Sequence, residues 1–129
     1  MKANLKITLA VLAGLIAGAA ATVAMHAKPQ KTPPGYIISE VDVADPAAYQ
    51  TYAKQVPETL APFGGHFLVR GGKANAVEGE APKRIVVIAF DSYEKAQAWE
   101  DSAAYGAIKS IRHNAARSRV IVAEGIAGQ

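Results

Sequence analysis

The sequence predicts an α+β fold with the element order β-α-β-β-α-β. Four short stretches are rich in β-branched and aromatic residues, and two longer stretches carry apolar residues at helical spacing. The chain has 129 residues, and its first part has the composition of a targeting segment, so about a hundred remain for folding. A chain of that size holds one modest hydrophobic core and leaves no room for a second domain.

The first half of the domain is expected to contain a strand, a helix and a second strand. Residues 36–43 (YIISEVDV) alternate along the chain in the way a strand does. Asp45 is placed to cap a helix with proline at its first position, and Pro57 is expected to perturb that helix. Two glycines at 64–65 end the helix, and residues 66–70 (HFLVR) form a short strand.

The second half begins with the strongest strand of the chain. Residues 84–90 (RIVVIAF) are apolar on both faces, which predicts a central strand. Ser92 is placed to cap a second helix, and a break near 101–104, with a restart at Ser102, divides that helix into two pieces. Residues 117–124 (RSRVIVAE) form the last strand. This order predicts the ferredoxin-like arrangement, a four-stranded antiparallel sheet with two helices on one face.

The apolar residues of the central strand imply a partner. Alternate residues of 84–90 point to opposite sides of the sheet, and both sets are apolar. The two helices cover only one face, so something else has to cover the other. The simplest candidate is the same sheet from a second copy. We therefore expect a homodimer that pairs through its sheet faces.

The first 27 residues have the features of a signal peptide or an N-terminal membrane anchor. Lys2 and Lys6 precede an uncharged apolar stretch at 7–24, the order that secretory signal peptides show. Small residues at a cleavage site after Ala24, or after Ala27, favour removal and a periplasmic or secreted protein. The alternative is an uncleaved helix of residues 7–24 that anchors the protein in the inner membrane, because its length is near the lower limit for spanning a bilayer.

A proline-rich linker at residues 28–34 joins this segment to the domain at 35–126, and residues 127–129 form a tail. The three prolines of the linker are incompatible with a helix or a central strand. Membrane contact is expected only if the first segment stays attached to the protein.

Charge and residue types exclude several classes of function. Without Lys2 and Lys6, twelve basic residues face eleven acidic ones, which argues against a nucleic-acid binder. The chain has no cysteine, which excludes thiolate chemistry and disulfides. His66 and His113 lack ligand spacing and no glycine-rich phosphate-binding motif is present, so we expect no metal site and no cofactor.

Four stretches carry a family resemblance: GGHFLVRGG at 64–72, VADPAAY at 43–49, A-x-x-W at 96–99 and VIVAEG at 120–125. Over residues 35–126 the chain resembles the bacterial family called domain of unknown function 1330. The resemblance implies a dimeric α/β barrel of ferredoxin-like protomers and implies no established activity. The chain departs from the family pattern W-Y-x-S-P-x-Y at 99–105, where Glu100 replaces the tyrosine after the tryptophan and Ala103 replaces the proline.

Arg70 is the first candidate for a functional residue. It ends a strand immediately before Gly71 and Gly72, which allow a ligand to approach the backbone closely. A guanidinium there is suited to clamp a carboxylate or an enolate, and the alternative is a structural ion pair. Strand alternation puts His66 on the same face as Arg70. His66 is thus the candidate catalytic acid or base, the alternative being an exposed histidine at a strand start.

Trp99 and Tyr105 flank the predicted helix break and are candidates for the walls of a small pocket, with core packing as the alternative for Trp99. Three functions stay open. The first is binding of a small acidic or aromatic metabolite, with Arg70 as the anion clamp. The second is a cofactor-independent oxygenase or isomerase, by analogy with other dimeric α/β barrels. The third is a structural or stress-related dimeric module.

Overall fold

Eight elements follow one another in the part of the chain that the computed structural model describes, residues 31–128. They are β1 (Gly35–Val43), α2 (Pro46–Leu60), the 3-10 helix η1 (Ala61–Phe63), β2 (His66–Arg70), β3 (Arg84–Phe90), α3 (Tyr93–Glu100), α4 (Ala103–Ala115) and β4 (Ala116–Glu124). The predictions for residues 1–27 and for the start of the linker lie outside the described residues. Within the described range no helix is both long and apolar enough to cross a membrane.

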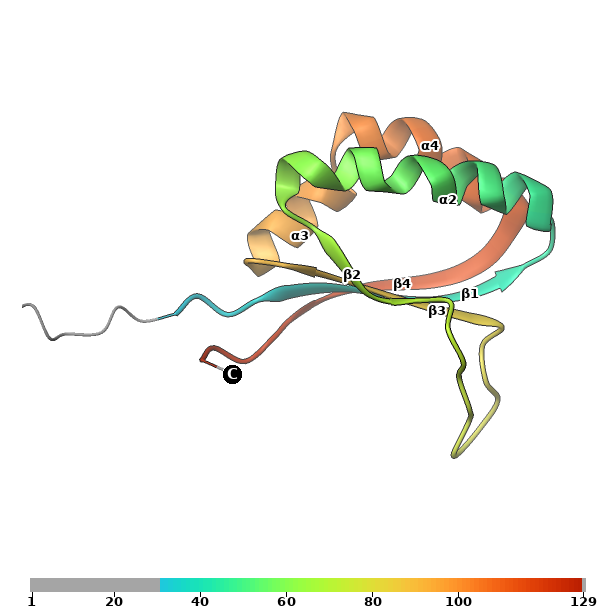
Figure 1. The fold of residues 1–129 in the computed structure, drawn as a ribbon, viewed down its shortest axis with the longest axis horizontal. Helices are drawn as coiled ribbons and strands as arrows, with labels where there is room; N and C mark the ends of the chain where they lie inside the picture. Colours follow the sequence, from blue (N-terminus) through green and yellow to red (C-terminus); the bar gives the residue numbers. More distant parts are fainter. Residues whose placement is uncertain (1–30, 129) are drawn as a thin grey trace, which may run out of the picture. The chain divides into compact units, whose positions relative to one another are not determined.

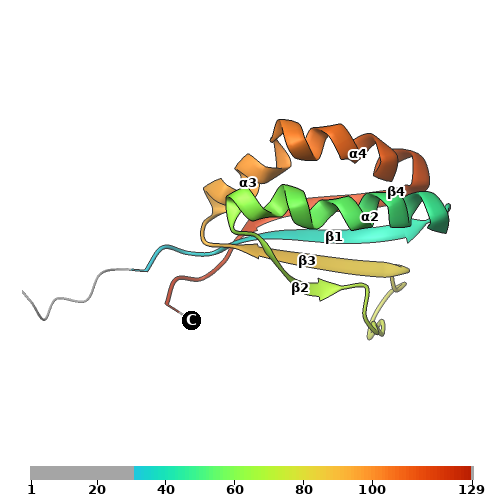
Figure 2. The same ribbon diagram turned by 45° about the horizontal axis from the view of Figure 1, so that its top comes forward.

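The four strands form one antiparallel sheet in the order β2-β3-β1-β4. α2, α3 and α4 lie on one face of the sheet (Figure 1), and α2 and α4 run side by side above it (Figure 2). β3 has a neighbour on each side, as its apolar sequence predicts. The predicted ferredoxin-like fold is confirmed, and Ser102 divides the second helical region into α3 and α4 by accepting a 3.2 Å hydrogen bond from the backbone N–H of Tyr105.

α2 begins where the sequence predicts and contains the residue expected to disturb it. Asp45 Oδ1 accepts a 3.1 Å hydrogen bond from the backbone N–H of Ala48 and caps the helix. Pro57 lies inside α2, where its ring nitrogen has no hydrogen to donate to the carbonyl of Ala53, four residues earlier. The helix continues through Pro57 and leaves this carbonyl to another donor.

The core lies between the helices and the covered face of the sheet. Its largest fully buried side chains are Trp99, Phe90, Ile37 and Val41. Trp99 stacks on Tyr105 with ring centroids 3.9 Å apart, and its indole N–H donates a 3.0 Å hydrogen bond to Oγ1 of Thr59. Trp99 therefore packs as a core residue with its one polar atom satisfied.

A β-bulge in β2 decides which of its side chains face the helices. The pairing of β2 with β3 is regular at His66 and Phe67 and then shifts, so that Leu68 has no partner in β3. Because one extra residue reverses the alternation, Arg70 lies on the same side as Phe67, toward the helices, and His66 lies on the other side. The expectation that His66 and Arg70 share a face is wrong for this reason.

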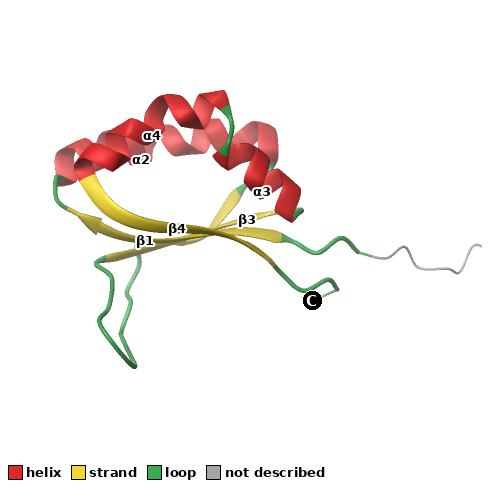
Figure 3. Ribbon diagram, turned by 180° about the vertical axis from the view of Figure 1, so that it is seen from behind, coloured by secondary structure: helices red, strands yellow, loops and turns green. Residues whose placement is uncertain are grey.

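The other face of the sheet is not covered by any helix of residues 31–128 (Figure 3). An apolar row crosses it over all four strands, made of Val69, Val87, Ile38 and Ile121, and we call it the open-face row. Val69 and Ile121 are each 40% exposed. The loop of residues 71–83 projects from the sheet on this same side (Figure 1). The described part of the chain thus leaves its second sheet face without a covering layer.

Candidate functional site

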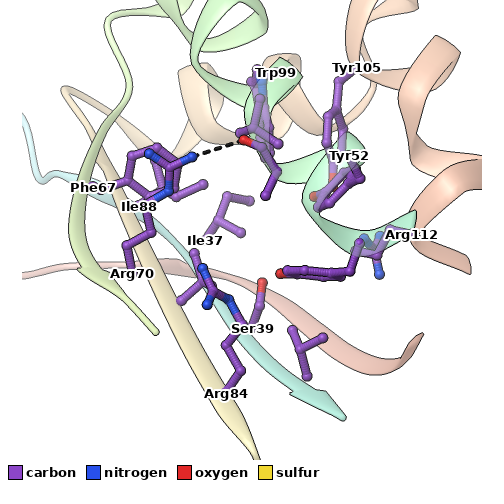
Figure 4. A pocket seen from close by; sticks show the side chains of 15 residues that line it. Ile37, Ser39, Tyr52, Phe67, Arg70, Arg84, Ile88, Trp99, Tyr105 and Arg112 are labelled. Atoms are coloured by element: carbon purple, nitrogen blue, oxygen red, sulfur yellow. Dashed lines mark hydrogen bonds between the residues drawn. The ribbon is translucent and has the colours of Figure 1, made fainter. Parts of the chain in front are cut away.

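A pocket lies between the helices and the covered face of the sheet (Figure 4). The residues that line it are Ile37, Ser39, Val41, Tyr49, Tyr52, Ala53, Val56, Phe67, Arg70, Arg84, Val86, Ile88, Trp99, Tyr105 and Arg112. β1 and β3 form its floor, the helices form its roof, and β2 forms its edge. The free space is about 30 Å³, which is room for one or two water molecules.

Arg70 forms the edge of the pocket. Its Nη2 donates a 2.8 Å hydrogen bond to the backbone oxygen of Ala53 in α2. This is the carbonyl that Pro57 leaves without a helical donor, so the guanidinium takes the place of the missing N–H. The same guanidinium lies 4.2 Å from the ring centroid of Phe67. Arg70 therefore joins the edge strand to α2.

Arg84 enters the pocket from the first residue of β3 and has few partners. Its Nε is buried without a hydrogen-bond partner among the described residues, and the ion pairs found in that range do not involve it. Its guanidinium lies 5.4 Å from the ring centroid of Tyr49. Gly71 lies directly against it, at a φ of +67°, and a Cβ added there would collide with the Arg84 guanidinium. Glycine at position 71 thus makes room for Arg84.

Arg112 enters from α4 and is only 5% exposed. Its Nη1 donates a hydrogen bond to Oγ of Ser118 in β4, and its Nε has no partner within residues 31–128. Burial lowers the pKa of Arg112, but Tyr105, Tyr52 and Glu100 outweigh burial, so the pKa is raised above its ordinary value. Arg112 therefore carries its positive charge into the protein interior.

Three aromatic side chains form one wall of the pocket. The hydroxyl groups of Tyr52 and Tyr105 share a 2.7 Å hydrogen bond, and Tyr105 stacks on Trp99. Burial, reinforced by the neighbouring Tyr105, raises the pKa of Tyr52 well above its ordinary value. The Tyr52 hydroxyl keeps its proton near neutral pH. This wall supplies apolar surface and hydrogen-bonding hydroxyls rather than a base.

The pocket has an excess of positive charge. Arg70, Arg84 and Arg112 reach it from three different elements (Figure 4), and none of the described residues that line it is an aspartate or a glutamate. Attraction between charges is stronger in a partly buried site than in water, because the effective dielectric constant is lower. The arrangement suits a small anion whose remaining surface is apolar.

Two other hollows on the described part of the chain differ from this pocket in charge. One lies at β1 and β4 and is lined by both signs, with Glu40, Asp42 and Glu80 facing Lys83, Arg117 and Arg119. The second lies between α4 and β4, where Glu100 and Lys109 form an ion pair of 2.7 Å. Residues 31–128 contain no cluster of three acidic, histidine or cysteine side chains suited to a metal ion. Unbalanced charge therefore singles out the pocket under the helices.

The pocket contains only some of the residues that the sequence predicted as functional. Those that line the pocket are Arg70, Trp99 and Tyr105. Gly71 is not among the lining residues, but it follows Arg70 in the chain and lies against the Arg84 guanidinium. Gly72 is exposed and has open space around it. His66 is exposed at the start of β2, on the opposite side of the sheet, so it is not placed to act as a base in this pocket.

Sequence reasoning missed Arg84 and Arg112, although each had a signal. Arg84 alternates in step with the buried residues Val86 and Ile88, which places all three on the side of the sheet that faces the helices. Arg112 lies four residues after Ile108, in line with the apolar stripe of its helix. An arginine at a position where the periodicity predicts an apolar core residue points toward the core. Such a charge in or near the core indicates a binding site.

The family of this chain is identified by comparison with known proteins. A family model described as "Domain of unknown function (DUF1330)" matches residues 34–126. The chain belongs to the DUF1330 family. This confirms the resemblance that the glycine-flanked stretch at 64–72 carried. A comparison with curated proteins finds no match.

Two solved structures are similar to this DUF1330 protein in fold. A protein of unknown function from Rhodopseudomonas palustris is 18% identical with a TM-score of 0.59, over 75% of this chain and 85% of that one. SnoaB, a cofactor-independent oxygenase from Streptomyces nogalater, is 11% identical with a TM-score of 0.52, over 71% of this chain and 92% of that one. At these identities the likeness shows a shared fold, so function has to be argued from the pocket.

Proposed function

We propose that this DUF1330 protein binds a small organic acid in the pocket between its helices and its sheet. The observation that supports the proposal is the charge of the pocket, where three guanidinium groups face a space with no acidic residue among its described lining. The Nε–H groups of Arg84 and Arg112 are buried without a partner among the described residues, which costs free energy, and an anionic ligand that accepts hydrogen bonds from them reduces that cost. A carboxylate is the favoured anion because it accepts two parallel hydrogen bonds from one guanidinium.

Binding is better supported than acid–base catalysis. None of the described residues that line the pocket is a histidine, an aspartate or a glutamate, and Tyr52 has its pKa raised. An oxygenase or isomerase that abstracts a proton needs a base within hydrogen-bonding reach of its substrate. The fold shared with the oxygenase SnoaB is the support for the enzymatic alternative, and shared fold alone does not transfer an activity.

Trp99 provides a direct test, because it is the only tryptophan of the chain and borders the pocket. The protein is titrated with acetate, butyrate and benzoate at constant ionic strength, and tryptophan fluorescence and thermal unfolding are followed. We expect a saturable change in both with at least one acid. Butyramide, which has the shape of butyrate without its charge, is the control and should have no effect.

A response to butyramide as strong as that to butyrate would overturn the role of the guanidinium groups. If no acid changes either signal, acid binding is refuted and the structural dimeric module becomes the better account.

We also propose that two copies pair through their open sheet faces. The open-face row of Val69, Val87, Ile38 and Ile121 supports this pairing, because exposed apolar surface that spans a whole sheet is typical of an interface. Light scattering on the domain without its first 30 residues should give twice the protomer mass at micromolar concentration. A monomer under those conditions would refute the pairing.

Export remains a proposal that rests on the N-terminal sequence. Lys2 and Lys6 followed by the apolar residues 7–24 favour a cleaved signal peptide and a periplasmic or secreted protein. Mass spectrometry of the mature N-terminus tests it. An intact Met1 in the membrane fraction would show that the segment is an anchor instead.

A further inference from the structure

We propose that Arg84 is the residue that binds the carboxylate of the ligand, and that the ligand is a short-chain aliphatic monocarboxylate. This inference rests on the proposed function of the pocket and adds the specificity-determining residue and the substrate class. Arg70, the clamp that the sequence predicted, is instead a positioning residue that holds the pocket's edge.

Arg70 already has partners in the protein. Its Nη2 bonds to the carbonyl oxygen of Ala53 at 2.8 Å, and its guanidinium plane lies on Phe67. Because Pro57 cannot supply an N–H to Ala53, release of Arg70 would leave that carbonyl without its protein donor. Recruitment of Arg70 by a ligand therefore carries a cost that Arg84 does not share.

Arg84 has no comparable bond to a described residue. Its Nε is buried and without a partner in the described part of the chain, and its guanidinium lies near the ring of Tyr49 and against the backbone of Gly71. An unpartnered buried N–H donor is costly in the empty pocket and is satisfied when a carboxylate arrives. Arg112 also has a free Nε, but its Nη1 is held by Ser118.

The pocket is polar at one end and apolar at the other. Strand register sets its floor in three rows, Arg84 with Val41, then Val86 with Ser39, then Ile88 with Ile37. The row of Ile88 continues into β2 at Phe67, so the floor at this end is apolar, with the Arg70 guanidinium held over the Phe67 ring at its edge. A ligand with its carboxylate at Arg84 therefore extends its other end over Ser39 toward carbon surface.

The size and lining of the pocket restrict the ligand further. About 30 Å³ of free space holds one or two water molecules, so a carboxylate with a few carbons requires the walls to move slightly and a rigid aromatic ring requires them to move much further. A phosphate has no apolar part, whereas the floor of this pocket is apolar at Val41, Val86, Ile37 and Ile88. A short aliphatic chain is the body that fits.

The test is a calorimetric titration of the full-length protein with acetate, propionate, butyrate, benzoate and phosphate at constant ionic strength. We expect affinity to rise about fourfold per added methylene from acetate to butyrate, because each buried methylene adds apolar contact. Benzoate and phosphate should bind at least tenfold more weakly than butyrate. Equal binding of phosphate, or tighter binding of benzoate, overturns the assigned ligand class.

Variants separate the roles of the arginines. Arg84→Gln should weaken butyrate binding at least tenfold with an unchanged or higher melting temperature, and Arg84→Lys should restore part of it. Arg70→Gln should weaken binding less than Arg84→Gln and lower the melting temperature. Arg119→Gln, which removes an exposed charge paired with Glu40, is the control and should leave butyrate binding unchanged.

The outcomes distinguish this inference from the proposed function. If acids bind and Arg70→Gln abolishes binding while Arg84→Gln does not, the role of Arg84 is refuted and the acid-binding pocket stands. If no carboxylate binds the wild-type protein, both fail together.

Discussion

The two faces of the sheet are built from the same four strands but differ in charge and exposure. The face covered by the helices holds three arginines and no acidic residue among its described pocket lining, and the Nε atoms of Arg84 and Arg112 are buried there without a partner in residues 31–128. The open face exposes an apolar row with no charge in it. Buried charge and exposed apolar surface are both costly in an isolated protomer, so each points to something that binds there. The first suits a small anion, and the second suits another protein surface.

The difference between the faces follows from the alternation of the strands. In β3, Arg84 shares the covered face with Val86 and Ile88, while Ile85 and Val87 face the other way. β3 thus supplies Arg84 to the pocket and Val87 to the open-face row. Variants on each face test this difference separately.

Trp99→Ala should have the largest effect on the covered face. The side chain is 1% exposed, stacks on Tyr105 and donates to Thr59, so its loss leaves a cavity and removes the donor to the Thr59 hydroxyl. We expect the free energy of unfolding to fall by about 3–5 kcal/mol in urea denaturation. The same change at Tyr93, which is half-buried outside the pocket lining, should cost clearly less. Equal costs would mean that Trp99 is not central to the core.

Val87→Glu should separate the protomers without unfolding them. Val87 lies in the middle of the open-face row, where a paired sheet would bury the new carboxylate without a partner. We expect the dimer dissociation constant to rise at least about 100-fold, close to 3 kcal/mol, in analytical ultracentrifugation. Ala98→Glu, on the exposed side of α3, is the control. A dimer that survives Val87→Glu uses another surface.

Arg84→Met should stabilise the ligand-free protein. The substitution removes a buried donor that has no partner among the described residues and keeps an unbranched side chain of similar length. Replacing buried charge by apolar groups is often neutral or stabilising, and we expect a gain of about 1 kcal/mol in the free energy of unfolding. A loss of 1 kcal/mol or more on the same scale would show that Arg84 has a structural role.

Pro57 and Arg70 should be energetically coupled, with the smallest effect of the four. Pro57→Ala supplies the helical N–H that Ala53 lacks, so the hydrogen bond from Arg70 becomes dispensable. A double-mutant cycle with Arg70→Gln should give a coupling of about 0.5–1 kcal/mol in urea denaturation. Additive effects would show that the bond to Ala53 contributes nothing.

Much of the fold could be predicted from the sequence because its signals are local. Asp45 and Ser102 cap helices at the predicted positions, and the apolar pattern of 84–90 identified the inner strand. The bulge at Leu68 could not be predicted, because alternation carries no mark of an extra residue until pairing with β3 is known. That one residue moved Arg70 to the covered face and left His66 on the open one.

The candidate site was predicted only in part, since it depends on contacts between distant positions. Trp99 and Tyr105 were identified because they flank a visible helix break. Arg84 and Arg112 come together from a strand and a helix well apart in the chain, and no local pattern joins them. The partnership of Arg70 with Ala53 likewise depends on how β2 packs beside α2.

The side-chain Nε–H signal of Arg84 in a protein with ¹⁵N-labelled arginine tests the central claim most directly. If Arg84 is the anion-binding group, this signal should shift saturably on addition of butyrate, with the same dissociation constant that calorimetry gives, and butyramide should leave it in place. An Nε–H signal that does not move while butyrate binds, or that moves equally with butyramide, would contradict the account.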